Sequence, residues 1–109
     1  MFEIKQVDAT QTEIVISANI DPAPFVAAYV GHFMAVAEKQ TVRIYLNPEV
    51  VIPLENMFRI YTAIKKKRKT TQIKIDNMTI YIQDKATAQC CNHLVFLTQC
   101  AFPVHVASL

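Results

Sequence analysis

Two cysteines and a histidine lie close together in the run Cys90-Cys91-Asn92-His93. On a helix, Cys90 and His93 would be three residues apart and could share a face, so that both could reach one metal ion. A structural zinc site needs four ligands, which usually come as two pairs. The other candidates in this part of the sequence, Cys100 and His105, stand alone. We therefore expect no metal site and interpret the cysteines as small buried core residues.

Nucleophilic catalysis would need a hydroxyl or thiol oriented by a nearby base. The sequence offers three histidines as bases, His32, His93 and His105, but no recognisable motif surrounds any of them. His32 follows the glycine of an apolar segment, and we interpret it as a surface or packing histidine.

The carboxylates and the glycine content also argue against an enzyme. Glu49 and Glu55 flank Pro53 without a motif that would pair them for acid–base chemistry. Gly31 is the only glycine, whereas phosphate-binding loops and dinucleotide fingerprints need several within a few residues. We predict no catalytic residues, no cofactor and no enzymatic activity.

Positive charge is concentrated in one segment of the second half of the chain. Residues 1–58 contain three basic and seven acidic residues, and residues 59–109 contain eight basic and two acidic ones. Most of the excess comes from one run: Lys65, Lys66, Lys67, Arg68 and Lys69. We interpret the run as the solvated end of a helix, where cations complement the dipole. A contact with an anionic membrane surface is the alternative, whereas nucleic acid is not expected, because no aromatic residues are interleaved with the run.

Length and composition predict one globular domain over residues 1–109, with 52% hydrophobic and 18% charged residues. The three cysteines are an odd number, and the first residues lack the apolar core of a secretory signal. The longest charge-free stretch, 86–109, contains too many polar residues for a membrane span. We expect a cytoplasmic protein.

Apolar periodicity predicts the first half of the fold. Alternation over the first twenty residues indicates a β-hairpin with a turn at 8–12 and a second strand at 13–20. Asp21 followed by Pro22 is a helix-start signal, and helical spacing continues to about Gln40. Alternation returns at 41–46 as a third strand.

The second half continues the alternation of strands and helices. A short extended run at 50–52 precedes Pro53, which opens a second helix over 54–67. A strand follows at 72–75 and a turn at Asp76-Asn77, and the pattern at 79–83 permits another strand. A third helix at 86–100 and a strand at 103–106 complete the order β-β-α-β-α-β-(β)-α-β. This order is typical of the α/β class and predicts a mixed sheet with helices packed on it.

The central segments carry a resemblance to a known family. They are Val42-Arg43-Ile44-Tyr45-Leu46-Asn47, Val50-Val51-Ile52, Pro53-Leu54-Glu55-Asn56 and Thr71-Gln72-Ile73-Lys74-Ile75. In order and spacing they resemble the core of a STAS domain, the fold of bacterial anti-sigma-factor antagonists. The resemblance extends over residues 2 to 76 and is weaker beyond them.

The resemblance implies a regulatory module that binds a partner protein and catalyses nothing. The partner would be an anti-sigma kinase or a transporter subunit. The family's Asp-Ser-Ser-Gly motif is missing, and Glu55 stands where the family has its phosphorylated serine. We therefore expect no switch by serine phosphorylation. Glu55 could supply a permanent negative charge there, or it could be an ordinary first-turn glutamate.

Two further classes of function stay open at this stage. One is a small subunit of a lipid or solute transport complex, and the other is a small-molecule-binding α/β domain, which would need a large apolar pocket.

The order of elements also predicts where a partner would bind. In a parallel α/β sheet, the loops after the strand C-termini meet at one edge, where ligands usually bind. We expect this edge to be acidic and to favour a basic partner. The partner-binding residues predicted there are Asp21, Asn47, Glu49, Leu54, Glu55, Asn56 and Arg59.

Overall fold

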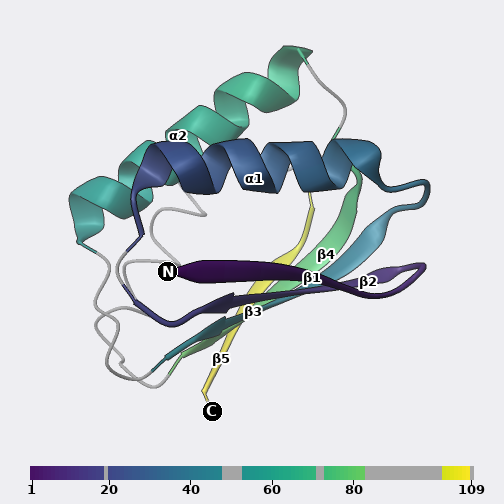
Figure 1. Cartoon of the computed structure of the whole chain (residues 1–109), viewed down its shortest axis with the longest axis horizontal. Coiled ribbons are helices and arrows are strands. Elements are labelled where there is room, and N and C mark those ends of the chain that lie inside the picture. Colours follow the sequence, from purple (N-terminus) through teal and green to yellow (C-terminus); the bar gives the residue numbers. More distant parts are fainter. Residues whose placement is uncertain (19, 48–52, 71–72, 83–101, 109) are drawn as a thin grey trace.

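The computed structural model describes residues 1–18, 20–47, 53–70, 73–82 and 102–108 (Figure 1). Strands and helices alternate along this part of the chain much as the sequence predicts. The elements in chain order are β1 (Phe2–Asp8), β2 (Gln11–Ile16), α1 (Pro22–Ala35), β3 (Gln40–Leu46), α2 (Leu54–Thr70), β4 (Ile75–Ile82) and β5 (Val104–Ser108).

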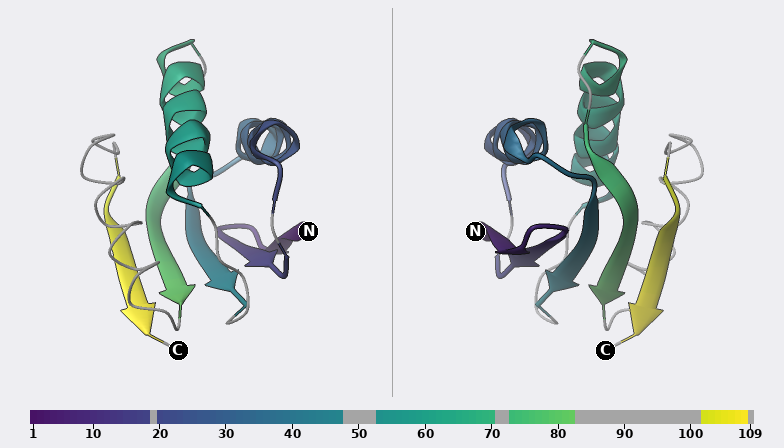
Figure 2. Two further views of the ribbon diagram at one scale, coloured as in Figure 1. Left: turned by 90° about the vertical axis from the view of Figure 1, so that its left-hand side faces the viewer. Right: turned by 90° about the vertical axis from the view of Figure 1, so that its right-hand side faces the viewer.

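The described strands form one mixed sheet whose spatial order, β1-β2-β3-β4-β5, follows the chain. β1 pairs with β2 antiparallel, and every later pair is parallel. α1 connects β2 to β3, and α2 connects β3 to β4. Both crossovers step in the same direction across the sheet, so a common handedness places both helices on the same face. Figure 2 shows this arrangement, which confirms the predicted α/β class.

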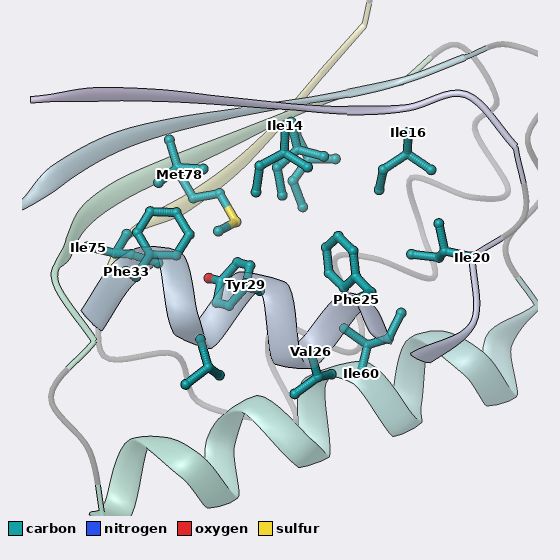
Figure 3. Packing of buried hydrophobic residues seen from close by; sticks show 14 of the residues in the cluster. Ile14, Ile16, Ile20, Phe25, Val26, Tyr29, Phe33, Ile60, Ile75 and Met78 are labelled. Atoms are coloured by element: carbon teal, nitrogen blue, oxygen red, sulfur yellow. The ribbon is translucent and has the colours of Figure 1, made fainter. Parts of the chain in front are cut away.

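The hydrophobic core lies between the two helices and the sheet. Figure 3 shows Phe25, Tyr29 and Phe33 on the side of α1 that faces the strands. Their ring centroids are 6.0 Å apart for the first pair and 4.8 Å apart for the second, so the rings form a continuous row along the helix. The strands supply the other half of the core through alternate residues, among them Ile14, Ile16, Val42, Ile44, Leu46, Met78 and Ile80.

α1 begins where the sequence predicts it and ends five residues earlier. Asp21 is the N-cap and accepts a hydrogen bond from a backbone N–H of the first turn. The helix ends at Ala35, so the prediction that it continues to Gln40 is wrong. Gln40 is instead the first residue of β3, where its side chain is fully buried. The Nζ atom of Lys74 donates to the Val36 carbonyl at 2.9 Å and satisfies one of the oxygens left free by the helix end.

The first hairpin turns more tightly than its sequence predicts. The turn is Ala9-Thr10, and Asp8 stabilises it by accepting from the Thr10 N–H at 2.9 Å. β2 therefore starts at Gln11, inside the predicted turn, and ends at Ile16 instead of residue 20.

β4 contains the clearest correction to the predicted strands. Asp76-Asn77 is a turn signal in the sequence, but β4 runs through it without a break from Ile75. Gln40 pairs with Ile75 and Thr41 with Asn77, so Asp76 is one extra residue in β4. Such a bulge accommodates a turn-forming residue without ending the strand. Residues 73 and 74 precede the strand, so the strand predicted at 72–75 begins too early, whereas the strand predicted at 79–83 is confirmed over residues 79–82.

The remaining expectations concern other parts of the chain. The last strand is confirmed as β5, and the second helix is confirmed and extends to Thr70. The predicted run at 50–52, the third helix at 86–100 and the cysteines lie outside the described residues. Over the part that is described, neither helix is both long and apolar enough to cross a membrane.

Candidate functional site

β2 and β3 end side by side at the edge of the sheet where the sequence predicts partner binding. Ile16 pairs with Leu46, and the N–H of Asn47 then donates to the Ile16 carbonyl at 3.0 Å. From this edge the chain enters α1 through Asp21 and enters α2 at Leu54. The parallel topology thus brings Asp21, Asn47 and the start of α2 to one edge of the sheet. Glu49 lies outside the described residues.

The carboxylates at this edge are already engaged within the chain. Asp21 is exposed but uses an oxygen to cap α1. Glu55 Oε1 and Arg59 Nη2 are 2.6 Å apart, four residues apart on α2, with side chains 72% and 62% exposed. Such an exposed pair contributes only about 0.3–0.5 kcal/mol to the helix. It does, however, offset the Glu55 charge, so this edge is less acidic than its carboxylates alone would make it.

An exposed aromatic ring lies beside this ion pair. Phe58, in the second turn of α2, is 51% exposed, whereas Ile60 two residues later is buried. Phe58 is not among the partner-binding residues predicted from the sequence, because an apolar residue within a helix is first interpreted as a core residue. The available signal was that Phe58 shares its side of the helix with Glu55 and the exposed Thr62, which are polar. Single exposed apolar residues are common on protein surfaces, so it is the combination of this aromatic ring with the neighbouring Arg59 that makes Phe58 a candidate contact residue.

The remaining predicted residues lie in the same two turns of α2. Asn56 is half-buried, Arg59 is exposed, and Leu54 is the first residue of the helix. The basic run occupies the other end of α2, where Lys65 is half-buried and Lys66 and Lys67 are exposed. The two ends of α2 therefore differ in their side chains: the N-terminal end has an aromatic ring and an ion pair, and the C-terminal end has a run of cations.

A buried polar cluster lies at the opposite edge of the sheet, where β2 and β3 begin. Thr12 and Gln40 are both 0% exposed. The Thr12 hydroxyl lies 2.8 Å from Gln40 Oε1, 3.1 Å from His32 Nε2 and 3.3 Å from Gln6 Oε1. Gln6 Nε2 also donates to Gln40 Oε1, at 2.9 Å.

The Gln40 amide group is fully used in this cluster. Its Nε2 donates to the carbonyls of Ala9 and Glu38 at 2.8 and 3.0 Å, while its Oε1 accepts from Thr12 and Gln6. With the Thr12 hydrogen directed at Gln40, His32 Nε2 is the donor to Thr12. Burial lowers the pKa of His32 below its ordinary value of 6.5, which favours the neutral ring. The cluster joins the hairpin, α1 and β3, and we interpret it as a structural element.

The sheet face turned away from the helices carries a second set of polar and aromatic contacts. Tyr45 and Tyr81 stack across β3 and β4 with centroids 4.9 Å apart and planes within 8° of parallel. On the neighbouring row, Arg43 Nη2 lies 3.3 Å from Glu13 Oε1 and donates to Gln11 Oε1 at 2.8 Å. These groups contact one another across the strands, as cross-strand pairs in sheets do.

A metal site finds no support among the described residues, and the spaces between their helices and strands differ widely in size. No group of three or more His, Cys, Asp or Glu side chains in this part of the chain could hold a metal ion, and His105 is an exposed residue of β5. A mainly apolar cavity of about 50 Å³ lies between the sheet and both helices, lined by residues such as Ile44, Ile60 and Met78. A larger groove of about 540 Å³ lies between α1 and α2. Pockets for drug-sized ligands have about 300–1,000 Å³.

Comparison with known proteins identifies no relative of this chain. The chain matches no protein-family model, no curated protein and no solved structure at a significant level. The resemblance to STAS domains therefore stays a prediction from the sequence.

Proposed function

We propose that this chain is a non-catalytic regulatory module of the STAS-like type that binds a partner protein through the first turns of α2. The observation that carries the proposal is the half-exposed Phe58 beside the Glu55–Arg59 ion pair. Aromatic residues and arginine are enriched at protein interfaces and dominate their binding energy. The α2 binding surface is defined here as Glu55, Phe58, Arg59 and Thr62.

The gain from covering Phe58 can be estimated from its exposure. About half of a phenylalanine side chain, roughly 100 Å² of apolar surface, is open to water. Removing that area from water at about 25 cal/mol per Å² is worth about 2.5 kcal/mol, or about sixtyfold in affinity. One such anchor, surrounded by polar contacts, is the usual pattern of an interface hot spot.

The sequence around the first turn of α2, residues 53–57, supports a constitutive interaction. Residues 53–57 are Pro-Leu-Glu-Asn-Met and contain no hydroxyl group. Phosphorylation of a serine or threonine changes the charge of a docking surface. This turn contains no hydroxyl that could accept the phosphate. The hydroxyl of Thr62 belongs to the α2 binding surface but lies outside this turn. We propose that binding is regulated by the availability of the partner, an anti-sigma kinase or a transporter subunit, and a phosphate found on Thr62 by mass spectrometry would contradict this.

The alternative functions have weaker support. The cavity of about 50 Å³ is too small for a drug-sized ligand, so a small-molecule-binding domain would have to use the groove of about 540 Å³ between α1 and α2, which is lined mainly by apolar side chains of α1. A membrane-surface adaptor would bind through the basic run at the C-terminal end of α2. Substitutions in that run therefore distinguish this alternative from the proposed function.

The proposal is tested on the partner recovered with the tagged chain from its native host. We expect Phe58→Ala to weaken the purified complex by about ten- to sixtyfold, measured by calorimetry. Val15→Ala is the matched control, because Val15 is also exposed but is a residue of β2 rather than α2. It should change the affinity by less than twofold. An affinity insensitive to Phe58→Ala, together with loss of binding when Lys65–Lys67 are replaced by alanine, would assign the interface to the basic run instead.

A further inference from the structure

β1 forms one side of the sheet, and no other described strand lies beyond it (Figure 2). The Ser17 N–H donates to the Met1 carbonyl at 2.9 Å, which makes these two residues a hydrogen-bonded pair in the register of β1 with β2. Hydrogen-bonded and non-hydrogen-bonded pairs alternate along an antiparallel ladder. The backbone N–H and C=O groups of Phe2, Ile4 and Gln6 therefore point away from β2, towards the side where another strand could pair.

The segment Phe2–Gln6, defined here as the β1 edge, is fixed at both of its ends. The ring of Phe2 packs edge-on against Phe25 of α1, with the ring centroids 5.1 Å apart. At the other end, the side chain of Gln6 donates to the buried Gln40 at 2.9 Å. An edge that is already ordered loses little conformational freedom when another strand pairs with it, which favours binding.

The β1 edge carries two opposite charges on the face of the sheet away from the helices. Glu3 and Lys5 are both exposed. Neither side chain makes a hydrogen bond or ion pair with another residue in the part of the chain that the structure describes. A single charge on an edge strand discourages pairing with another chain. Two opposite charges two residues apart can instead complement each other in a second copy that runs antiparallel.

We infer that two copies of this chain pair antiparallel through their β1 edges, with Ile4 of each copy opposite Ile4 of the other. In this register the outward backbone groups of Phe2, Ile4 and Gln6 can bond to one another. Glu3 of each copy lies opposite Lys5 of the other, at the non-hydrogen-bonded positions, where facing side chains are closest. Opposite charges that face each other across antiparallel strands stabilise the pairing.

The neighbouring registers lack this complementarity. Pairing centred on Glu3 or on Lys5 would place two like charges opposite each other, which is destabilising. Pairing centred on Ile4 instead extends a row of charges that the fold already contains. Lys5 lies opposite Glu13 of β2, and Glu13 lies opposite Arg43 of β3. With Glu3 of the second copy beside Lys5, the charges alternate in sign across the interface.

The helices do not oppose this arrangement by charge. Antiparallel pairing of two identical strands places the α1 helices of both copies on the same face of the joined sheet. α1 contains no aspartate, glutamate, lysine or arginine between Pro22 and Ala35, so the two helices do not repel each other electrostatically. Val7 is an extra residue in β1 and ends the regular pairing after Gln6. The interface is therefore short, and we expect a weak dimer with a dissociation constant of about 10–100 µM.

Sedimentation velocity from about 5 to 500 µM protein measures the dimer, and charge reversals identify its interface. Glu3→Lys and Lys5→Glu each place like charges opposite each other at two symmetric contacts and should weaken the dimer about tenfold or more. An equimolar mixture of the two variants should associate as tightly as the original chain, because each lysine then lies opposite a glutamate. Lys66→Glu is the matched control, since it makes the same change of charge at an exposed position of α2. It should leave the dimer unchanged.

Hydrogen exchange measured by NMR tests the register without any substitution. The N–H groups of Ile4 and Gln6 should exchange about three- to fourfold more slowly at 1 mM than at 50 µM protein, because only the dimer bonds them. The N–H groups of Glu3 and Lys5 are bonded to β2 in the monomer. Their exchange should not depend on protein concentration.

The inference does not depend on the proposed function, because the α2 binding surface contributes no residue to the β1 edge. Phe58→Ala should therefore leave the dimer unchanged. A chain that stays monomeric up to about 500 µM would overturn the inference, and so would a dimer that tolerates both charge reversals. The same holds if the mixture of Glu3→Lys and Lys5→Glu fails to associate although circular dichroism shows both variants folded. A dimer that is lost in Phe58→Ala would place self-association on α2 instead.

Discussion

Replacement of Thr12 by valine tests the buried polar cluster most directly. Valine keeps the β-branched shape that suits a strand and removes only the hydroxyl. In the folded chain this hydroxyl donates to Gln40 Oε1 at 2.8 Å and accepts from His32 Nε2 at 3.1 Å. Both Thr12 and Gln40 are fully buried, so water cannot replace the lost partner without a rearrangement.

The expected loss follows from these contacts. A neutral hydrogen bond contributes about 1 kcal/mol, and a donor left without a partner costs about 1–3 kcal/mol when buried. Gln40 Oε1 keeps its second donor, Gln6, and His32 is only half-buried, so the cost lies near the lower end. We expect Thr12→Val to lower the free energy of unfolding by about 1–2 kcal/mol. In a chain of this length the melting temperature should fall by about 4–8 °C.

The assay is urea unfolding followed by far-ultraviolet circular dichroism, since the chain contains no tryptophan. Thr79→Val is the matched control, because Thr79 is a half-buried strand residue on the opposite face of the sheet. It should change the free energy of unfolding by less than about 0.5 kcal/mol. If both substitutions cost the same, or if Thr12→Val costs nothing, the cluster does not stabilise the fold as argued.

Two further predictions concern pH and helix capping. Burial lowers the pKa of His32, so at a given pH the His32 side chain is protonated more readily in the unfolded chain than in the folded one. The free energy of unfolding should therefore rise with pH between the folded pKa and the ordinary value of 6.5, and it should fall when the solution is acidified through the same range. His32→Gln should remove that part of the dependence in urea titrations at pH 5 and 7.5, and an unchanged pH profile would rule out His32 as its source. Asp21→Ala removes the cap of α1 and should cost about 0.5–1 kcal/mol in thermal unfolding, whereas Asp21→Asn should restore most of it. Equal losses in the two variants would show that capping is not the role of Asp21.

The sequence was sufficient for features that depend on neighbouring residues. Alternating apolar residues define the period of β2 and β3, and helical spacing from Phe25 to Phe33 defines the buried side of α1. Asp21 before Pro22 marks a helix start because the capping bond is made within one turn. These local signals, combined with the handedness of crossovers, are enough for the α/β class and the mixed sheet.

The candidate sites show where this kind of reasoning stops. Asp21, Asn47 and Glu55 could be placed at one edge of the sheet, since parallel strands expose their C-termini together. The sequence did not reveal that Glu55 pairs with Arg59 or that Phe58 faces water. Both depend on the rotation of α2 about its axis, which is fixed by its packing against the core.

Long-range pairing decided the remaining features of this protein. Thr12 looked like a turn residue, and Gln40 looked like the end of a helix, because both are polar. Each became a buried strand residue since hydrogen bonds from segments far apart in the chain satisfy its side chain. Asp76 likewise has a turn-forming side chain, but the pairing of β4 with β3 on either side of it keeps it within the strand as the extra residue of a bulge. The sequence by itself determined the period and class of the elements. Tertiary structure alone decided the start of β2, the C-terminal end of α1, the start of β4 and the burial of polar groups, because those depend on partners that local propensity does not identify.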